Sequence, residues 1–359
     1  MRVLQIAKNT MPLCYLPSGK LVCYSMGNVL VMQDGKVEKS LPVFHSKKER
    51  ILGSCRYLYR LLRMGARAAW TLDEHNVVLS IGNTIYELNL ESGALSDGYF
   101  CGKGIRPLIF TEVKGVTAIA DGIYFGAYLD NRPMNPVSIF KRESTDHWKV
   151  VYTFPQGAVN HVHIIVSDIY RDCLWIFTGD FDEASAIWRV RNNFQTIERV
   201  CCNEQKYRGC VVFSLPEGLL YATDAPFATN HLYLMKPESG FEINELKEID
   251  GSCIYGCQWR DKYVFATTVE PDGRNTSLIK AFTCRKRGAG IKDEFVHLYI
   301  GNITNGFSEI YKEKKDRLPY AAFQFGAFKF PYGVNNTESI FFQPVATQKN
   351  DLRLLKLMH

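Results

Sequence analysis

Polar side chains that could transfer protons or bind an anion recur in the chain at two kinds of position. The first kind follows an apolar, strand-like run and is occupied by Asn83, Asp130, Asp180, Asp182, Asp224 and Glu270. The second kind precedes or begins the next apolar run and is occupied by Arg67, Arg106, His161, His163, Gln205, Tyr207, Arg208, Tyr255 and Gln324. Carboxylates, guanidinium groups, imidazoles and phenols in one site suit a polar, polyhydroxylated or anionic ligand better than an apolar one.

Two histidines stand two residues apart in the segment Asn160-His-Val-His163, so both imidazoles lie on the same side of a strand. They could form a hydrogen-bonded pair that fills a channel. One of them could instead act as a general acid or base, because an unperturbed imidazole titrates near neutral pH. A metal site would need a third ligand that the sequence does not reveal. We therefore predict neither a metal nor a cofactor.

Some of the carboxylates named above lie in segments that also resemble turns. Asp180 and Asp182 end the segment Thr178-Gly-Asp-Phe-Asp182, where they either cap a turn through backbone amides or act on a ligand. Glu270 precedes Pro271, which marks a turn, so this glutamate is either an exposed turn residue or a catalytic one. A glycoside hydrolase would need two such carboxylates facing each other across the scissile bond.

Arg208 could bind the carboxylate of a substrate through two parallel hydrogen bonds, with the phenol of Tyr207 beside it. The alternative is a salt bridge between Arg208 and Asp224 within one repeat unit. The catalytic candidates that we predict are His161, His163, Asp180, Asp182, Asp224, Glu270 and Tyr207. The substrate-binding candidates are Arg208, Gln205, Arg106, Arg67, Asp130 and Asn230.

A repeated unit of strands must position these residues. Apolar strand pairs recur with a period of roughly 40–55 residues, which is typical of β-propeller blades of four strands. Examples are 77–83 followed by 84–90, and 174–180 followed by 185–190. The units begin near residues 13, 67, 107, 160, 207, 251 and 320. We therefore predict an all-β fold, a single seven-bladed β-propeller over residues 1–359, with six blades as the alternative because the first unit is the least regular.

The two ends of the chain complement each other. Residues 1–6 form an apolar strand that belongs to no unit, whereas the last unit lacks its outer strand. Pairing of these segments would close the ring. In such a ring the ends of the second strands and the starts of the first strands open on the same face, so the polar residues above would converge there.

The composition excludes several classes of protein. Of the residues, 46% are hydrophobic and 13% aromatic, which favours strands, and the net charge of +6 is modest for 359 residues. The chain has no long basic run with interleaved aromatic residues, so we do not expect it to bind nucleic acid. No window approaches a transmembrane segment, and the N-terminus lacks the features of a secretion signal. The eleven cysteines are scattered without metal-ligand spacing, so we expect reduced thiols and a cytoplasmic location.

One segment, residues 46–64, does not fit the repeat and is predicted as a helical or loop insertion between blades one and two. Arg56, Arg60 and Arg63 recur at helical spacing, with Leu58 and Leu61 on another face. This pattern indicates a helix that packs on the propeller with a solvated basic edge. The alternatives are a role in binding an anionic ligand or a membrane surface.

Two segments resemble the Asp-box of the BNR/Asp-box group of sialidase-like β-propellers. They are Ser185-Ala-Ile-Trp-Arg-Val-Arg-Asn-Asn-Phe-Gln-Thr196 and Val137-Ser-Ile-Phe-Lys-Arg-Glu-Ser-Thr-Asp-His-Trp148. In that group the box forms a hairpin turn between the outer strands, but in both segments most of its Asp and Gly positions hold other residues. The resemblance implies a propeller that processes or binds glycans. The arginine triad and Tyr–Glu pair of sialidases do not map onto this chain residue by residue.

The function that we expect is that of a carbohydrate-active enzyme, a glycoside hydrolase or polysaccharide lyase that acts on an acidic or polyhydroxylated glycan. In a lyase, Arg208 would neutralise the carboxylate of a uronate while a histidine or Tyr207 removes a proton. The alternative is a non-catalytic propeller that binds a glycan or a protein partner. An open pocket lined by unpaired charges would favour the enzyme, whereas internal pairing of those charges and a sealed channel would favour the scaffold.

Overall fold

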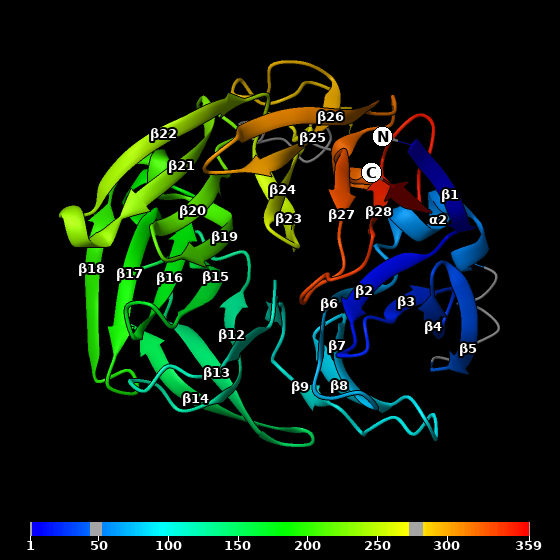
Figure 1. The fold of residues 1–359 in the computed structure, drawn as a ribbon, viewed down its shortest axis with the longest axis horizontal. Coiled ribbons are helices and arrows are strands. Elements are labelled where there is room, and N and C mark those ends of the chain that lie inside the picture. Colours follow the sequence, from blue (N-terminus) through cyan, green and yellow to red (C-terminus); the bar gives the residue numbers. More distant parts are fainter. Residues whose placement is uncertain (1, 44–51, 273–282, 359) are drawn as a thin grey trace.

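The computed structural model describes residues 2–43, 52–272 and 283–358, and it is a ring of seven antiparallel sheets around a central axis (Figure 1). Each sheet is a blade whose first strand lies next to the axis. The first three strands of a blade are consecutive in the sequence, and blades follow one another round the ring. The prediction of a seven-bladed propeller is confirmed, and the six-bladed alternative is wrong.

The strands of the seven blades have the following bounds. Blade one contains β2 (Met11–Tyr15), β3 (Leu21–Ser25), β4 (Asn28–Gln33) and β5 (Lys36–Pro42). Blade two contains β6 (Ala66–Thr71), β7 (Asn76–Ile81), β8 (Thr84–Asn89) and β9 (Tyr99–Phe100). Blade three contains β10 (Arg106–Pro107), β11 (Thr111–Val113), β12 (Gly122–Tyr128), β13 (Val137–Ser144) and β14 (His147–Phe154). Its innermost strand is thus divided into two short pieces that both pair with β12.

The remaining blades follow the same order. Blade four contains β15 (His161–Asp168), β16 (Cys173–Gly179), β17 (Ala186–Arg191) and β18 (Thr196–Cys202). Blade five contains β19 (Gly209–Leu215), β20 (Gly218–Thr223), β21 (Asn230–Lys236) and β22 (Glu242–Ile249). Blade six contains β23 (Cys253–Trp259), β24 (Lys262–Thr267), β25 (Phe295–Asn302) and β26 (Gly306–Lys314). Blade seven contains β27 (Ala327–Lys329), β28 (Ser339–Val345), β29 (Arg353–Met358) and β1 (Arg2–Lys8).

The N-terminal strand closes the ring. β1 pairs antiparallel with β29, and the register joins Arg2 to Met358 and Lys8 to Arg353. The first strand of the chain thereby becomes the outer strand of the last blade, as the sequence indicated. The two termini accordingly lie close together (Figure 1).

The core lies between the blades. The second strand β16 is buried along its whole length, because both of its faces pack against neighbouring blades. The outer strand β22 is half-buried to exposed along most of its length, and only Ile249 at its end is buried. Aromatic rings fill the spaces between sheets, as in the contact of Phe177 on β16 with Tyr221 on β20, whose ring centroids are 5.4 Å apart. The high aromatic content of the chain is therefore mainly a packing feature.

The insertion between blades one and two contains a short helix, α2 (Arg56–Leu61), while residues 46–51 of the segment lie outside the described residues. The prediction of a solvated basic edge is wrong for Arg60, which is fully buried. Its guanidinium pairs with Asp351 at 3.0 Å and with Asp316, and it donates to the carbonyl of Phe323. These contacts fix α2 against blade seven and α4 (Tyr320–Phe323). Burial of an arginine requires such partners.

All eleven cysteines are free thiols, and most are buried. In the described part of the chain, no helix combines the length and apolar character that a membrane crossing needs. The segments that resemble the Asp-box form the hairpins between β13 and β14 and between β17 and β18.

Candidate functional site

A cavity of about 300 Å³ lies at the starts of the innermost strands, and we call it the polar pocket. Its wall comes from blades two to seven and from the end of the insertion. Seven of the predicted site residues line it, namely Arg67, Arg106, His163, Asp180, Arg208, Asp224 and Glu270. Tyr255 and Gln324, which the same strand pattern indicated, also line it. The second-strand ends and first-strand starts therefore meet on one face.

A repeated irregularity of the first strands directs side chains into this pocket. The pairing of β6 with β7 shifts register between Ala66 and Ala68, which leaves Arg67 as the extra residue. The pairing of β15 with β16 shifts in the same way around His163. The equivalent residues in blades five and six are Cys210 and Ile254. A bulge redirects its side chain, and all four of these residues line the polar pocket.

His161 and His163 form a buried pair at the start of β15. Nδ1 of His161 lies 2.9 Å from the carbonyl oxygen of Leu129, so this nitrogen carries the proton and Nε2 keeps a lone pair. Nε2 of His163 lies 3.0 Å from Nε2 of His161 and 3.3 Å from Oδ1 of Asp180, so it is the donor to both. Burial lowers the pKa of His163 and favours its neutral form. Gly179 permits this packing, because a Cβ there would lie 2.5 Å from Cε1 of His163.

Arg208 joins two carboxylates in the wall of the pocket. Its Nη2 lies 2.8 Å from Oδ1 of Asp180 and 3.1 Å from Oδ2 of Asp224. Burial disfavours the charge of Arg208, but Asp224 and Asp180 outweigh this effect and raise its pKa above the ordinary value. Burial would also raise the pKa of Asp180, yet its contacts with His161 and His163 and the charge of Arg208 hold that pKa well below its usual range. The salt bridge anticipated as the alternative role of Arg208 is therefore present.

The opposite wall of the polar pocket is cationic. It contains Arg63, Arg67, Arg106 and Lys329. Among the residues that the structure describes, no carboxylate forms an ion pair with any of these four. Burial and the charges of Arg106 and Arg63 lower the pKa of Arg67. Burial and the same cluster of arginines lower the pKa of Lys329 to about 7. Uncompensated cations at this density favour an anionic ligand.

Glu270 is the carboxyl group that is best placed to carry a proton at neutral pH. Burial and the charge of Asp224 raise its pKa to about 8, with Arg208 opposing them. Within the described chain, Oε2 of Glu270 accepts no hydrogen bond, and neither do Oδ1 of Asp224 and Nδ1 of His163. Buried polar atoms are normally paired, so three unpaired ones in a single pocket indicate that a ligand or water completes it.

Asp182, Gln205 and Tyr207 lie beside the pocket rather than in its wall. Gln205 and Tyr207 belong to a short 3₁₀ turn, η2 (Gln205–Tyr207), and Nε2 of Gln205 donates to Oδ1 of the exposed Asp182 across 2.7 Å. Asp182 begins a similar turn, η1 (Asp182–Ala184). The hydroxyl of Tyr207 lies 3.4 Å from a carboxylate oxygen of Glu204. These three residues therefore form a rim next to Asp180.

Asp130 and Asn230 lie elsewhere. Asp130 is exposed after the end of β12. Asn230 is fully buried at the start of β21, where its side chain accepts from the amide of Ala225 and donates to the carbonyls of Ala225 and Ala228. The side chain of Asn230 therefore stabilises a turn, together with the hydrogen bond from the amide of Ala228 to the carbonyl of Ala225, and it lies outside the wall of the polar pocket.

Among the polar and ionisable residues of the pocket, sequence reasoning missed Arg63, Tyr128, Cys210 and Lys329. Arg63 lies shortly before the first strand of blade two, which begins at Ala66, so the pattern that selected Arg67 could have included it. Lys329 ends β27, and the predicted start of blade seven near residue 320 falls instead in α4. Tyr128 lies beneath Arg106, whose guanidinium carbon is 4.6 Å from the centre of the ring.

Three side chains of the pocket region could bind a metal ion. The imidazoles of His161 and His163 and the carboxylate of Asp180 each offer one ligand atom, and these atoms lie within 4.8 Å of one another. A carbonyl hydrogen bond to the second nitrogen of His161 is typical of metal-binding histidines. Arg208 contacts the same oxygen of Asp180, so a cation at this position would have to displace or tolerate the guanidinium.

Comparison with known proteins supports the fold. The chain is similar to an oligogalacturonate lyase solved in complex with manganese, with a TM-score of 0.58 and 12% identity over 99% of this chain and 92% of that one. It is also similar to the Cps50 (Swd1) β-propeller domain of Myceliophteria thermophila, with a TM-score of 0.55 and 10% identity over 100% of this chain and 98% of that one. A chain of the mitotic checkpoint complex is similar at a TM-score of 0.55 and 9% identity, over 100% and 93% of the two chains.

These similarities define the class of the protein as a seven-bladed β-propeller. At such low identity they support the architecture alone, because one fold hosts unrelated functions. No family model matches the chain, and no curated protein matches it. Membership of the BNR/Asp-box group therefore stays a prediction.

Proposed function

We propose that this propeller is a carbohydrate-active enzyme that acts on an acidic glycan in the polar pocket. The observation that supports it most strongly is the cationic wall of Arg63, Arg67, Arg106 and Lys329, which has no internal counter-charge among the described residues. A uronate carboxylate supplies that charge, and planar guanidinium groups match its two oxygens. The polar residues of the rest of the lining suit the hydroxyl groups of the sugar.

Elimination is the reaction that this arrangement favours. A polysaccharide lyase neutralises the uronate carboxylate, which acidifies the adjacent C5–H bond. A base then removes that proton, the C4–O bond breaks, a C4–C5 double bond forms, and the departing oxygen takes up a proton. Arg67 and Arg106 are assigned the neutralisation of the uronate carboxylate. The neutral His163 is the proposed base, because its unpaired Nδ1 keeps a lone pair.

Glu270 is assigned the second proton transfer, in which the departing oxygen takes up a proton. A carboxyl group whose pKa is raised to about 8 is protonated at neutral pH and can donate to the departing oxygen. Asp180 stays ionised and orients the imidazole of His163, whose Nε2 donates to Oδ1 of Asp180. In the hydrolase alternative the same Glu270 would protonate the glycosidic oxygen, and Asp224 would be the second carboxylate.

The name of one structural neighbour agrees with this proposal, because that neighbour is an oligogalacturonate lyase. The other neighbours reported above favour a scaffold, and so does the pairing of Arg208 with Asp180 and Asp224. This pairing meets the expectation for a non-catalytic propeller, whereas the open pocket meets the expectation for an enzyme. The second candidate function is therefore a propeller that binds an acidic glycan without cleaving it.

A screen of acidic polysaccharides separates the three possibilities. Polygalacturonate, alginate and glucuronate-containing polymers are incubated with the protein, and both new reducing ends and ultraviolet absorbance of an unsaturated uronate are recorded. A lyase produces both signals, and a hydrolase produces reducing ends alone. Binding without either signal supports the scaffold. Absence of cleavage and of binding for every acidic polymer would contradict the proposal. Methyl-esterified pectin serves as the neutral control.

A further inference from the structure

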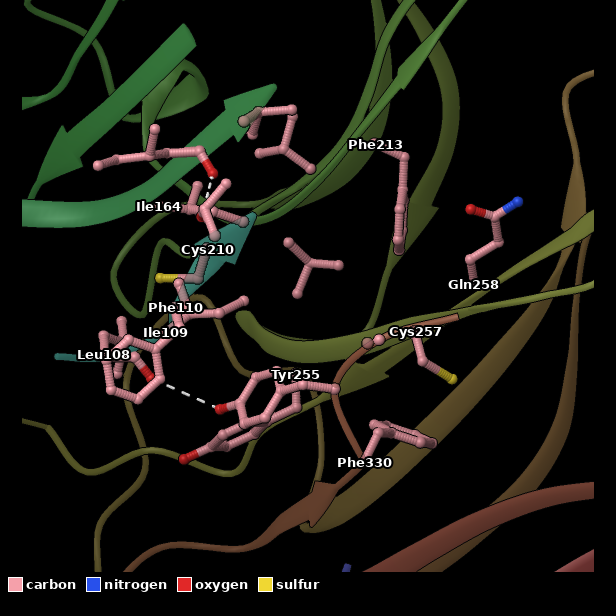
Figure 2. Close-up of a pocket in the computed structure, with 18 of the residues that line it drawn as sticks. Leu108, Ile109, Phe110, Ile164, Cys210, Phe213, Tyr255, Cys257, Gln258 and Phe330 are labelled. Carbon is pink, nitrogen blue, oxygen red and sulfur yellow. Dashed lines mark hydrogen bonds between the residues drawn. The ribbon is translucent and has the colours of Figure 1, made fainter. Parts of the chain in front are cut away.

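A second cavity, of about 260 Å³, adjoins the polar pocket through shared lining residues. We call it the apolar chamber (Figure 2). The lining residues of the first strands show that the two cavities follow one another along these strands. In β15 the polar pocket touches only His163, whereas the apolar chamber is lined from His163 to Ser167. In β23 the chamber extends from Ile254 to Gln258. Five residues line both cavities, namely Leu108, His163, Cys210, Ile254 and Tyr255.

Hydrocarbon side chains form most of the wall of the chamber. Figure 2 shows Ile109, Phe110, Ile164, Phe213 and Phe330 around it. Some polar groups in the wall have partners. Thr111 donates to the carbonyl of Ile165 across 2.7 Å, for example, and the hydroxyl of Tyr332 lies 3.5 Å from the carbonyl of Leu108. By contrast, Nε1 of Trp70, Oγ of Ser167 and Nδ1 of His163 have none among the described residues.

The chamber also lacks reactive thiols. Burial raises the pKa of Cys210 well above its ordinary value, and burial alone raises that of Cys257. Both side chains therefore stay protonated and behave as small apolar groups. A buried water needs about two to four polar partners. The few unpaired polar groups of this wall are outnumbered by its hydrocarbon side chains, so an apolar group fills most of the chamber better than ordered water does.

The size and position of the chamber allow a ligand to enter. A cavity of ~150 Å³ lined by apolar side chains holds a benzene ring, so about 260 Å³ is sufficient for a larger ring or a short alkyl chain. At the end away from His163, the chamber is lined by Val334, whose side chain is 63% exposed. The chamber therefore reaches the protein surface as well as the polar pocket.

We propose that the apolar chamber binds the hydrocarbon part of an amphiphilic anion whose charged head lies in the polar pocket. The ligand class is an acidic sugar that carries an alkyl, acyl or aryl group. The assignment of an acidic sugar as the charged head rests on the proposed function. The assignment of the hydrocarbon site does not. A wholly polar oligosaccharide would not match most of the chamber, because its hydroxyl groups would find few partners among the hydrocarbon side chains there.

Binding of two series of probes tests this proposal by titration calorimetry below any micelle concentration. The first series is 1-butanol, 1-hexanol and 1-octanol, which lack an acidic head. Each methylene that enters the chamber is expected to lower Kd roughly fourfold, equivalent to ~0.8 kcal/mol per buried CH2. The second series pairs each n-alkyl β-glucuronide with the matching n-alkyl β-glucoside, and the glucuronide is expected to bind at least tenfold more tightly.

Variants show where the probes bind. Ile109→Trp fills the chamber and is expected to abolish the dependence on chain length, and Val334→Trp at the surface end is the second variant in case the first does not fold. Val150→Trp, on the exposed outer strand β14, is the matched control and is expected to behave as the wild type.

The outcomes distinguish the two proposals. A Kd that does not depend on chain length, or a dependence that persists in both chamber variants, overturns the hydrocarbon site. Equal affinity for glucuronides and glucosides overturns the acidic head, and with it the proposed function, even where the dependence on chain length remains.

Discussion

Arg67 and Arg106 lie on neighbouring blades and line the same pocket, and no described carboxylate pairs with either guanidinium. Folding has thus brought like charges together on one wall while Arg208, on the other wall, is saturated by two carboxylates. The contrast separates a structural ion pair from cations that are available to a ligand. It moves the expected carboxylate-binding role from Arg208 to Arg67, Arg106 and their neighbours.

Removal of Arg208 is expected to destabilise the protein strongly. Arg208→Met leaves Asp180 and Asp224 without their shared cation, and breaking a buried pair in this way costs about 3–5 kcal/mol. Chemical denaturation measures the free energy of unfolding. Arg189→Met is the matched control, because Arg189 pairs with the more exposed Glu198 and its loss should cost at most ~1 kcal/mol. Equal effects of the two substitutions would show that the Arg208 contacts contribute no more than an exposed pair.

Glu270 is expected to make the protein less stable as pH rises. Its pKa in the folded state is about 8, above its unfolded value of 4.5, so the folded state binds more protons between these values. The free energy of unfolding should therefore fall through this window by at most about 1.4 kcal/mol per pH unit. Glu270→Gln should remove this component of the decline. Unfolding curves from pH 5 to 8 measure it, and an identical decline in the variant would contradict the raised pKa.

Lys329 is expected to make anion binding depend on pH near neutrality. Its pKa in the free protein is about 7, and an anion favours the protonated amine, so affinity should be high below pH 7 and weaken as pH rises through this value. Ionisation of Glu270 acts in the same direction, so the measurement uses a Glu270→Gln background. Kd for a uronate oligosaccharide is determined from pH 6 to 8.5 with and without Lys329→Arg. The arginine variant should retain tight binding at high pH. A parallel loss of affinity in both proteins would exclude Lys329 as the titrating group.

His163 is expected to affect turnover more than binding. His163→Gln removes the proposed base and should lower kcat by roughly 10²–10⁴ while Kd for the acidic glycan changes only slightly. His231→Gln is the control, because His231 is a partly buried histidine on β21 that does not line the polar pocket. Rates at saturating substrate and calorimetric Kd values are both required. Unchanged kcat in His163→Gln would exclude this residue as the base.

The fold could be predicted from the sequence because its signal is repeated. Each blade alone is a weak pattern, but apolar strands that recur in units of similar length leave few architectures, and the unpaired segment at residues 1–6 indicated how the ring closes. The same repeat brought together Arg67, His163, Asp224 and Glu270, since equivalent positions in a ring share one face.

The rest of the site depends on contacts that a local pattern does not encode. The ion pairs of Arg60 with Asp316 and Asp351 join residues far apart in the chain, so a helical stripe of arginines gave no sign of burial. Asn230 has a residue type that suits a ligand, but its side chain is buried in a turn, where it bonds to the backbone of Ala225 and Ala228. Lys329 was missed because α4 delays the first strand of blade seven.

The most direct test of an acidic-glycan site compares one oligosaccharide with and without its charges. Titration calorimetry gives Kd for an oligogalacturonide and for its methyl ester, with the wild type and with Arg106→Met. The wild type should bind the acid at least tenfold more tightly than the ester, and this preference should largely disappear in Arg106→Met, because charge-assisted hydrogen bonds contribute about 1.5–3 kcal/mol. Equal affinity of the wild type for acid and ester, or a preference that Arg106→Met leaves intact, would contradict the assignment.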